Sequence, residues 1–243
     1  MNYDQEKIWK FSKLHKIMSW PHDNLIEYLI IKSVSPNTIW EIGAGTGNWC
    51  MLMDHMLRPD KVNFHMVEDF KWNSLNLKFD YFWPRTPKEF TENIESTQSA
   101  LNQDKINSTY YFVDEKEIHN KLDELIDVIR IDVDVADPDS TMKWILDNGS
   151  KNLIVIVDDT VEISRVMMMQ EQIELGNLKL LWWGINSAAW CRTDLNSDDI
   201  LNSIVETPVE HFKQFQIRDQ KFMRRNNKFL ITWPTGTFHE LLR

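Results

Sequence analysis

The sequence predicts a single α/β domain of 243 residues with a mostly parallel central sheet, helices on both faces of the sheet and an antiparallel hairpin toward the C-terminal end. Three observations predict this fold class. Strand-like runs such as Leu153 to Val157 are continuously aliphatic, which is typical of strands that helices cover on both faces. These runs alternate along the chain with helical patterns. Four of them end in glycine-rich or acidic sequence, where ligands of such sheets bind.

The elements follow in order from the N-terminus. The first 35 residues predict two helices separated at Trp20-Pro21, with Asp23 or Asn24 as the cap of the second, and we interpret this region as a lid or flank. Thr38 to Ile42 then predicts a strand that opens into glycines. The expected helices after it are 49–57, 86–103, 140–146 with Asp139 as its cap, and 161–175, and the further expected strands are 62–67, 108–113, 125–131 and 153–157.

A hairpin is expected after these elements. Lys179 to Trp183 and Ser187 to Arg192 flank a Gly-Ile-Asn turn, so we expect two antiparallel strands at the edge of the sheet. From Asp194 onward the pattern is helical and polar until the apolar run 229–233. We therefore divide the single domain 1–243 into an N-terminal helical flank (1–35), a core (36–193) and a C-terminal extension (194–243).

The composition restricts the partners and the location of the protein. Lys and Arg number 27 against 37 Asp and Glu, and the formal net charge of −10 disfavours nucleic acid and anionic membranes as partners. The two cysteines, Cys50 and Cys191, provide no disulfide framework and no multi-cysteine zinc site. No run of residues has the length and hydrophobicity of a membrane span, and the N-terminus carries no apolar signal region. These features predict a cytoplasmic location.

A glycine-rich turn follows the first expected strand, in the run Glu41 to Gly47 (EIGAGTG). Such a turn lets the backbone approach a ligand closely. Its spacing is G-x-G-x-G, with Asn48 where a dinucleotide-binding loop would have its last glycine, which argues against NAD. Glu68 follows Gly47 by 21 positions and ends the second strand, where an acidic side chain can hold both hydroxyls of a ribose.

The run Glu41 to Gly47 resembles the first cofactor motif of class I S-adenosylmethionine (SAM) dependent methyltransferases, and the resemblance covers roughly residues 38–193. It implies a Rossmann-like, seven-stranded sheet that ends in an antiparallel hairpin. It also implies that the glycine loop wraps the methionine part of SAM, that the acid after the second strand binds the ribose and that a residue after the third strand meets the adenine. The implied SAM-binding residues are Glu41, Gly43, Ala44, Gly45, Gly47, Glu68, Asp69, Asp114 and Asp132.

A narrower resemblance begins at Ile129 to Asp134 (IRIDVD) and continues through Asp139-Ser140-Thr141 to Val155 to Thr160 (VIVDDT). These runs are similar to the metal-dependent branch typified by macrocin O-methyltransferases and cephalosporin hydroxylase-like proteins, and to catechol O-methyltransferases. The resemblance implies one Mg²⁺ held by three carboxylates, and hard oxygen ligands of this kind suit that ion. The implied metal ligands are Asp132, Asp158 and Asp159. The alternative is that Asp158 or Asp159 caps the next helix while Asp132 orders its loop.

These residues together predict transfer of the SAM methyl group to a hydroxyl of a small molecule, for which a sugar is one candidate, with Mg²⁺ assistance. A bound metal lowers the pKa of a coordinated hydroxyl, and Asp132 could accept the hydroxyl proton. An aromatic insertion at 70–83 is expected to contact the substrate. Two alternatives stay open: a metal-independent transferase acting on nitrogen or nucleic acid, and a SAM-binding protein without catalysis. The terminal extensions are long enough to pair subunits in a homo-oligomer.

Overall fold

The computed structural model describes residues 21–57, 60–68, 86–100, 109–113, 118–119, 123–133, 135, 137–160, 162–184, 186–205, 230–232 and 238–240. The helix expected before Trp20, the aromatic insertion at 70–83 and the acidic residues Asp69, Asp114 and Asp134 lie outside the described residues.

A seven-stranded sheet with the order β3-β2-β1-β4-β5-β7-β6 forms the centre of the molecule. Its first five strands are mutually parallel, whereas β7 runs antiparallel to both β5 and β6. The strands are β1 (Thr38–Ile42), β2 (Asn63–Val67), β3 (Thr109–Val113), β4 (Ile126–Ile131), β5 (Gly149–Val157), β6 (Leu178–Trp183) and β7 (Ala188–Arg192). The mostly parallel sheet with an antiparallel C-terminal hairpin, predicted from the sequence, is therefore confirmed.

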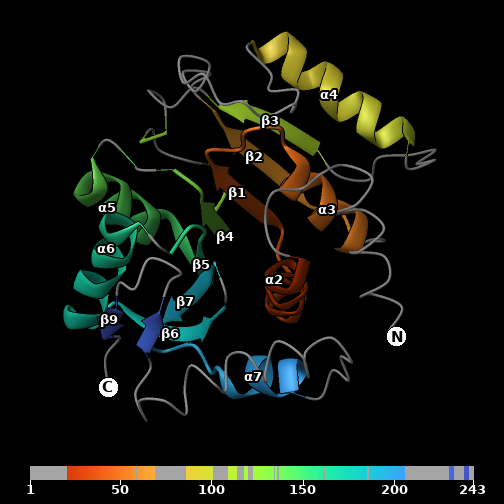
Figure 1. Ribbon diagram of the computed structural model, residues 1–243. Coiled ribbons are helices and arrows are strands. Elements are labelled where there is room, and N and C mark those ends of the chain that lie inside the picture. The colour runs from red at the N-terminus through yellow and green to blue at the C-terminus, as the bar shows by residue number, and fades with distance from the viewer. Residues whose placement is uncertain are drawn as a thin grey trace.

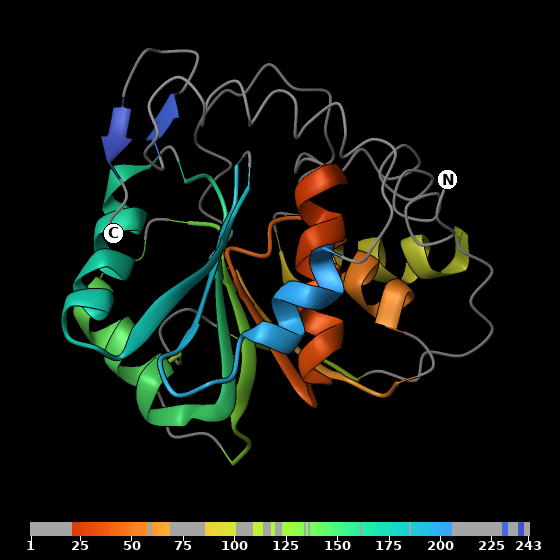
Figure 2. The ribbon, with the colours of Figure 1, turned by 90° about the horizontal axis from the view of Figure 1, so that it is seen from below.

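Helices cover both faces of this sheet. Figures 1 and 2 show α2, α3 and α7 on one side of it and α5 and α6 on the other, while α4 lies beyond α3. The helices are α2 (Pro21–Val34), α3 (Asn48–Leu57), α4 (Pro87–Ala100), α5 (Pro138–Asn148), α6 (Ile163–Glu174) and α7 (Asp198–Val205). Two short strands, β8 (Leu230–Thr232) and β9 (Phe238–Glu240), pair separately as an antiparallel ribbon.

The aliphatic strand runs supply both halves of the core. Along β5, Ile154 and Ile156 face a cluster formed with α2 and α3, whereas Leu153, Val155 and Val157 face a cluster formed with α5 and α6. All five side chains are fully buried. A strand needs apolar residues at every position only when both of its faces are covered, so this continuous run reflects its central place in the sheet.

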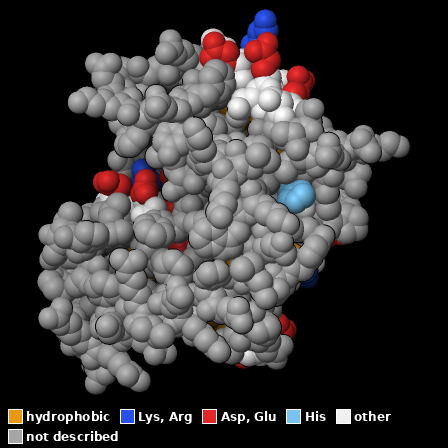
Figure 3. Space-filling view, turned by 45° about the vertical axis from the view of Figure 1, so that its right-hand side comes forward, with side chains coloured by type: hydrophobic (Ala, Val, Ile, Leu, Met, Phe, Trp, Pro, Cys, Tyr) orange, Lys and Arg blue, Asp and Glu red, His pale blue; other side chains and the backbone are white. Residues whose placement is uncertain are grey.

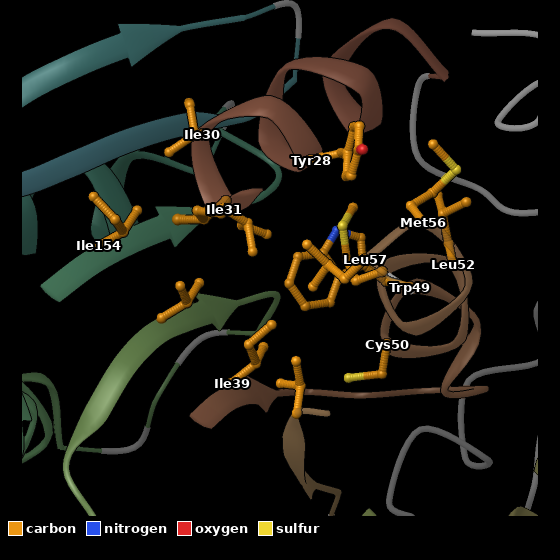
Figure 4. Close-up of a cluster of buried hydrophobic side chains, with 14 of the residues drawn as sticks. Tyr28, Ile30, Ile31, Ile39, Trp49, Cys50, Leu52, Met56, Leu57 and Ile154 are labelled. Carbon is orange, nitrogen blue, oxygen red and sulfur yellow. The ribbon is translucent and has the colours of Figure 1, made fainter. Parts of the chain in front are cut away.

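Helix α2 is part of the hydrophobic core. Its side chains from Leu25 to Ile31 include six apolar ones, all buried, and they contact the cluster that α3 and the sheet also form. Figure 4 shows Tyr28, Ile30 and Ile31 of α2 beside side chains of α3 and the sheet. Pro21 begins the helix, as its fixed φ and missing N–H favour. Asp23, expected as a cap, lies inside the first turn, and its carboxylate bonds to the distant β6–β7 turn.

Several boundaries differ from those expected, and the structure gives a reason for two of them. The cap of α5 is Asp137 rather than Asp139: its Oδ1 accepts a hydrogen bond from the backbone N–H of Ser140 at 3.1 Å. The reason is that Pro138 takes the first helical position, which places the capping residue immediately before it. Strand β5 begins at Gly149 rather than at Leu153, because Gly149 already pairs with Ile126 of β4.

The outward surface of α4 is charged. Lys88 and Glu92, one turn apart, form an exposed ion pair of 3.7 Å. In the space-filling view of Figure 3, acidic side chains and a basic one gather at the top of the face, where α4 lies. Among the described residues, no helix combines the length and the apolar character that crossing a membrane requires.

Candidate functional site

The glycine loop after β1 is held against the carboxyl ends of its neighbouring strands. Gly43, Gly45 and Gly47 all have positive φ angles, of 83°, 57° and 75°. The backbone N–H groups of Gly43 and Ala44 both donate to the carbonyl of Val67, at 2.9 and 3.0 Å. A Cβ on Gly43 would lie 2.3 Å from a methyl carbon of Val133, so only glycine fits at this position.

Glu68 lies immediately beside this loop. Because Ile42 and Val67 are partners in the parallel β1–β2 pair, Glu68 follows its strand at the level where the loop begins. Its side chain is 5% exposed, and Oε2 accepts a hydrogen bond from the backbone N–H of Gly45 at 2.7 Å. The structure thus brings together the glycine loop and the acid that the sequence analysis singled out. The contact of Glu68 with a ribose stays a prediction.

Helix α4 closes the other side of the loop. The side-chain amide of Asn93 donates to the carbonyl of Thr46 at 2.7 Å. A Cβ on Gly47 would lie 3.0 Å from the ring of Phe90 and 3.4 Å from Ile94. The third glycine is therefore needed for close packing against α4.

Strand alternation places a buried charged cluster above the apolar core on the α2 and α3 side of the sheet. Side chains of a strand alternate between its faces, so every second residue shares a face. Apolar side chains of β1, β4 and β5 on this face, Ile39, Val128 and Ile156, are each followed two positions later by Glu41, Arg130 and Asp158. Glu41 and Arg130 are direct partners in the β1–β4 pair. The charges thus gather toward the carboxyl ends of the strands.

Arg130 is the centre of this cluster and is only 2% exposed. Its Nη1 donates to Glu41 Oε1 at 2.6 Å and to Asp132 Oδ2 at 2.8 Å, and its Nη2 donates to Asp158 Oδ2. The guanidinium also lies over the ring of Trp49, at 5.2 Å from the centroid. Burial alone would lower the pKa of Arg130, but the surrounding carboxylates outweigh burial and raise it well above its usual value. The arginine is therefore a permanent buried cation.

Two buried glutamates, Glu27 and Glu41, interact with this cation. Burial raises the pKa of Glu41 to about 7, although Arg130 acts to lower it. Glu27 of α2 accepts a hydrogen bond from the indole N–H of Trp49 at 2.6 Å, and burial likewise raises its pKa to about 7. Cys50 donates to Glu41 Oε2 at 3.1 Å. The number of acids exceeds the number of bases, so the site has an affinity for positive charge.

The three aspartates expected to bind metal lie at the ends of β4 and β5. The backbone N–H of Asp132 donates to Ile42, and that of Asp158 donates to Ile131, both at 2.9 Å, so parallel pairing extends beyond the strands. Side-chain exposure rises from 8% at Asp158 to 28% at Asp132 and 48% at Asp159. Burial raises the pKa of Asp132 well above its usual value, with Asp158 and Glu41 adding to the effect against Arg130.

A second set of nitrogen donors surrounds these aspartates. Arg165 Nη1 donates to the carbonyl of Asp158 at 2.9 Å and lies 3.8 Å from Asp132 Oδ1 and 3.9 Å from Asp159 Oδ2. The side-chain amide of Asn186 donates to Asp158 Oδ1 at 3.2 Å and to Asp159 Oδ1 at 2.7 Å. Asp159 has a φ of +50°, a left-handed conformation that aspartate tolerates better than most residues.

The sequence analysis missed five of these residues: Asp23, Glu27, Arg130, Arg165 and Asn186. One signal was present for Arg130, because an arginine inside an otherwise aliphatic strand that helices cover on both faces must be paired. The others depend on contacts between distant segments, such as the bond from the backbone N–H of Asn186 to Asp23 Oδ2 at 2.7 Å.

The donor set does not fit Mg²⁺ in this arrangement. Mg²⁺ requires oxygen ligands at about 2.0–2.1 Å in octahedral geometry. Each carboxylate oxygen of Asp132 and Asp158 instead faces a guanidinium or amide nitrogen. Within the part of the chain that the structure describes, no group of three His, Cys, Asp or Glu side chains is arranged to hold a metal ion. The site does fit a cationic cofactor such as SAM, because a glycine loop, whose backbone can approach a ligand closely, lies beside an acidic cluster.

Comparison with known proteins identifies the type of fold. No protein-family model and no curated protein matches the chain. Many solved structures are similar to it, and three of them are described next. The S-adenosylhomocysteine-bound methyltransferase PaMTH1 of Podospora anserina is 14% identical, with a TM-score of 0.53 over 79% of this chain and 88% of that one. Cofactor-bound Rv0187 from MTB is 10% identical, with a TM-score of 0.55 over 81% and 92%. A Staphylococcus aureus protein assigned as a caffeoyl-CoA O-methyltransferase is 12% identical, with a TM-score of 0.53 over 79% and 93%.

These likenesses, at 10–14% identity, concern the fold and extend over most of each chain. The narrower resemblance to the macrocin and cephalosporin hydroxylase branch stays a prediction. The chain has the Rossmann-like fold of class I SAM-dependent methyltransferases.

Proposed function

We propose that this protein is an O-methyltransferase that transfers the methyl group of SAM to a hydroxyl of a small molecule. The observation that carries the proposal is the meeting of the glycine loop, Glu68 and Asp132 at one edge of the sheet. The similar structures support it, because PaMTH1 holds S-adenosylhomocysteine and Rv0187 holds a cofactor.

The cofactor side consists of the loop and Glu68. When bound, SAM supplies an electrophilic methyl group on a sulfonium cation. The positive φ angles of Gly43 and Gly45 turn the backbone so that it passes close to the ends of β2 and β4. Glu68 holds the loop through Gly45 and is the acid to which we assign the ribose hydroxyls. The acids at the strand ends outnumber the two arginines beside them, which favours a positively charged cofactor.

The acceptor side is built on Asp132. The loop approaches this residue closely, since Asp132 bonds to the backbone of Ile42 and its neighbour Val133 contacts Gly43. Its side chain is 28% exposed, and burial raises the pKa of its carboxyl group well above the usual value, which makes the carboxylate a stronger base. The hydroxyl oxygen forms a bond to the methyl carbon while the bond from that carbon to sulfur breaks. The hydroxyl proton passes to the Asp132 carboxylate.

The sequence also implied a sugar as the acceptor and Mg²⁺ as an assistant. The proposed reaction uses no metal, because the nitrogen donors around Asp132 and Asp158 do not fit one. The negative charge of the site favours neutral or cationic acceptors over phosphorylated ones. Sugars and catechols are therefore the first hydroxylated compounds to screen.

Calorimetric titration of SAM tests the cofactor half of the proposal. We expect Gly45→Arg to weaken SAM binding by about a hundredfold or more, because the large side chain would occupy the space proposed for SAM and its positive charge would repel the sulfonium cation. Gly176→Arg is the matched control: Gly176 also has a positive φ, of 76°, but lies in open space after α6. A wild-type protein that binds no SAM would overturn the proposal.

Turnover tests the acceptor half. Methyl transfer from labelled SAM to a panel of hydroxylated compounds should fall by about a hundredfold or more in Asp132→Asn, with SAM affinity kept within about tenfold. Amines in the same panel test the alternative of transfer to nitrogen. SAM binding without transfer to any member would instead support the non-catalytic alternative.

A further inference from the structure

Two of the three strand-end aspartates that the narrower resemblance assigns to Mg²⁺, Asp132 and Asp158, bind a guanidinium instead. We propose that Arg130 occupies the place of the divalent cation, so that the site works without metal and acquires a metal site only when this charge is removed. The role of this arrangement in catalysis rests on the proposed function. The exclusion of metal rests only on the geometry of the charged cluster and can be tested without measuring turnover.

Arg130 bridges the two strand ends as a metal ion would. Its two terminal nitrogens reach Asp132 Oδ2, at 2.8 Å, and Asp158 Oδ2. A guanidinium is a planar fork whose charge persists at any pH at which the protein folds. It also reaches Glu41 behind the aspartates, at 2.6 Å. A cation that joins these carboxylates is therefore already present, and the chain itself supplies it.

The second carboxylate oxygens of Asp132 and Asp158 also face nitrogen donors and are therefore not available as ligands for Mg²⁺. Asp132 Oδ1 faces Arg165 at 3.8 Å, and Asp158 Oδ1 accepts from the amide of Asn186 at 3.2 Å. An ion between the two aspartates would have to displace these donors and would lie close to two arginines. Like charges in a buried site repel strongly, because little water screens them. Arg130 thus excludes the metal by charge as well as by position.

Arg130 acts through Asp132 and is a positioning residue. By holding Asp132 Oδ2, it fixes the orientation of the carboxylate. Asp132 is the more exposed member of the pair, so it is the aspartate that an acceptor can reach. Removal of the guanidinium would leave Asp132, Asp158 and Glu41 with Arg165 as the remaining cation beside them. Oxygen ligands of this kind are what a divalent cation prefers.

A titration of the wild-type protein provides the first test and needs no variant. After treatment with a chelator, Mn²⁺ is titrated in and followed by electron paramagnetic resonance, and SAM affinity is measured in EDTA and in Mg²⁺. We expect no stoichiometric Mn²⁺ binding and SAM affinities equal within about twofold. Stoichiometric Mn²⁺ that Asp158→Asn abolishes would overturn the inference. If SAM binds in neither buffer, the proposed function fails, while the Mn²⁺ result still decides the role of Arg130.

Arg130→Met, Arg130→Lys and the control Arg192→Met provide the second test. Arg192 is another largely enclosed arginine, but it donates to carbonyls of Leu146 and Gly149 at the opposite end of β5. We expect Arg130→Met to bind Mn²⁺ at least about tenfold more tightly than wild type, and the other two variants to behave as wild type. A folded Arg130→Met that gains no Mn²⁺ affinity would overturn the inference. If this variant does not fold, the wild-type titration decides alone.

Discussion

Arg130 illustrates what a single buried charge requires of the residues around it. A guanidinium that is 2% exposed must be compensated by hydrogen-bonded acids, and Glu41, Asp132 and Asp158 provide this from three strands. The burial that makes this pairing necessary also raises the pKa values of the acids. Stability and protonation are therefore coupled at the same residues that form the candidate site.

Glu41 should make stability depend on pH. Its pKa rises from 4.5 to about 7 on folding, so the folded protein holds this proton more tightly than the unfolded chain. The free energy of unfolding therefore falls as the pH rises from about 4.5 to about 7. In Glu41→Gln, whose neutral amide resembles the protonated acid, we expect this fall to be smaller by up to about 3 kcal/mol.

Urea unfolding at both ends of this pH window measures the effect. Glu92→Gln is the control, because Glu92 is exposed on α4, and it should keep the pH dependence of the wild type. Parallel pH curves for Glu41→Gln and wild type would show that Glu41 is ionised throughout the range.

At the scale of elements, α2 connects the core to the site. One face of the helix packs into the apolar cluster, while Asp23 and Glu27 reach the β6–β7 turn and Trp49 of α3. Asp23 Oδ2 accepts hydrogen bonds from the backbone N–H groups of Asn186 and Ser187, at 2.7 and 3.0 Å. Asn186 in turn holds the aspartates after β5, so α2 indirectly positions them.

Replacement of Asp23 tests this connection. Asp23→Ala leaves two backbone N–H groups without their acceptor, at a cost of about 1–3 kcal/mol in the free energy of unfolding. We expect faster hydrogen exchange at the amides of Asn186 and Ser187, measured by NMR, together with the lower stability. Asp139→Ala, in the exposed first turn of α5, should leave both amides protected. Unchanged exchange in Asp23→Ala would show that the turn is held by other contacts.

At the scale of the whole molecule, the two helical layers close both faces of the sheet, and both thiols lie inside. Cys50 on α3 and Cys191 on β7 are fully buried, free and members of the same apolar cluster. Burial raises the pKa of the Cys50 thiol well above its usual value and that of Cys191 to about 11. Reactive thiolates are thus suppressed at two distant points of one core.

Thiol labelling should therefore report cooperative unfolding. We expect a disulfide reagent to modify neither cysteine in the native protein, and to modify both over the urea range in which tryptophan fluorescence changes. Cys191→Ala, which leaves one thiol, assigns the signal to Cys50. Labelling of Cys50 well below that range would show that α3 and the glycine loop open separately from the sheet.

Local sequence signals determined the order of the elements and the positions of the ligand-binding strand ends. The continuous aliphatic run Leu153 to Val157 predicted a strand covered on both faces, and it forms the buried part of β5. The glycine run and Glu68 were identifiable because turns, strand periods and acidic strand ends are properties of neighbouring residues. The structure confirmed that these residues lie together, through the bond from Gly45 to Glu68.

Only the tertiary structure decided which charges are paired. The sequence shows Asp132, Asp158 and Asp159 as a set suited to a metal, and it shows Arg130 within the same run. It does not show that the guanidinium binds two of these aspartates. It also does not show that Asn186 binds Asp159, or that Asp23, 163 residues before Asn186, accepts a hydrogen bond from it. Such contacts depend on strand register and on the packing of α2, and the cost of burying an unpaired charge makes them necessary once the chain is folded.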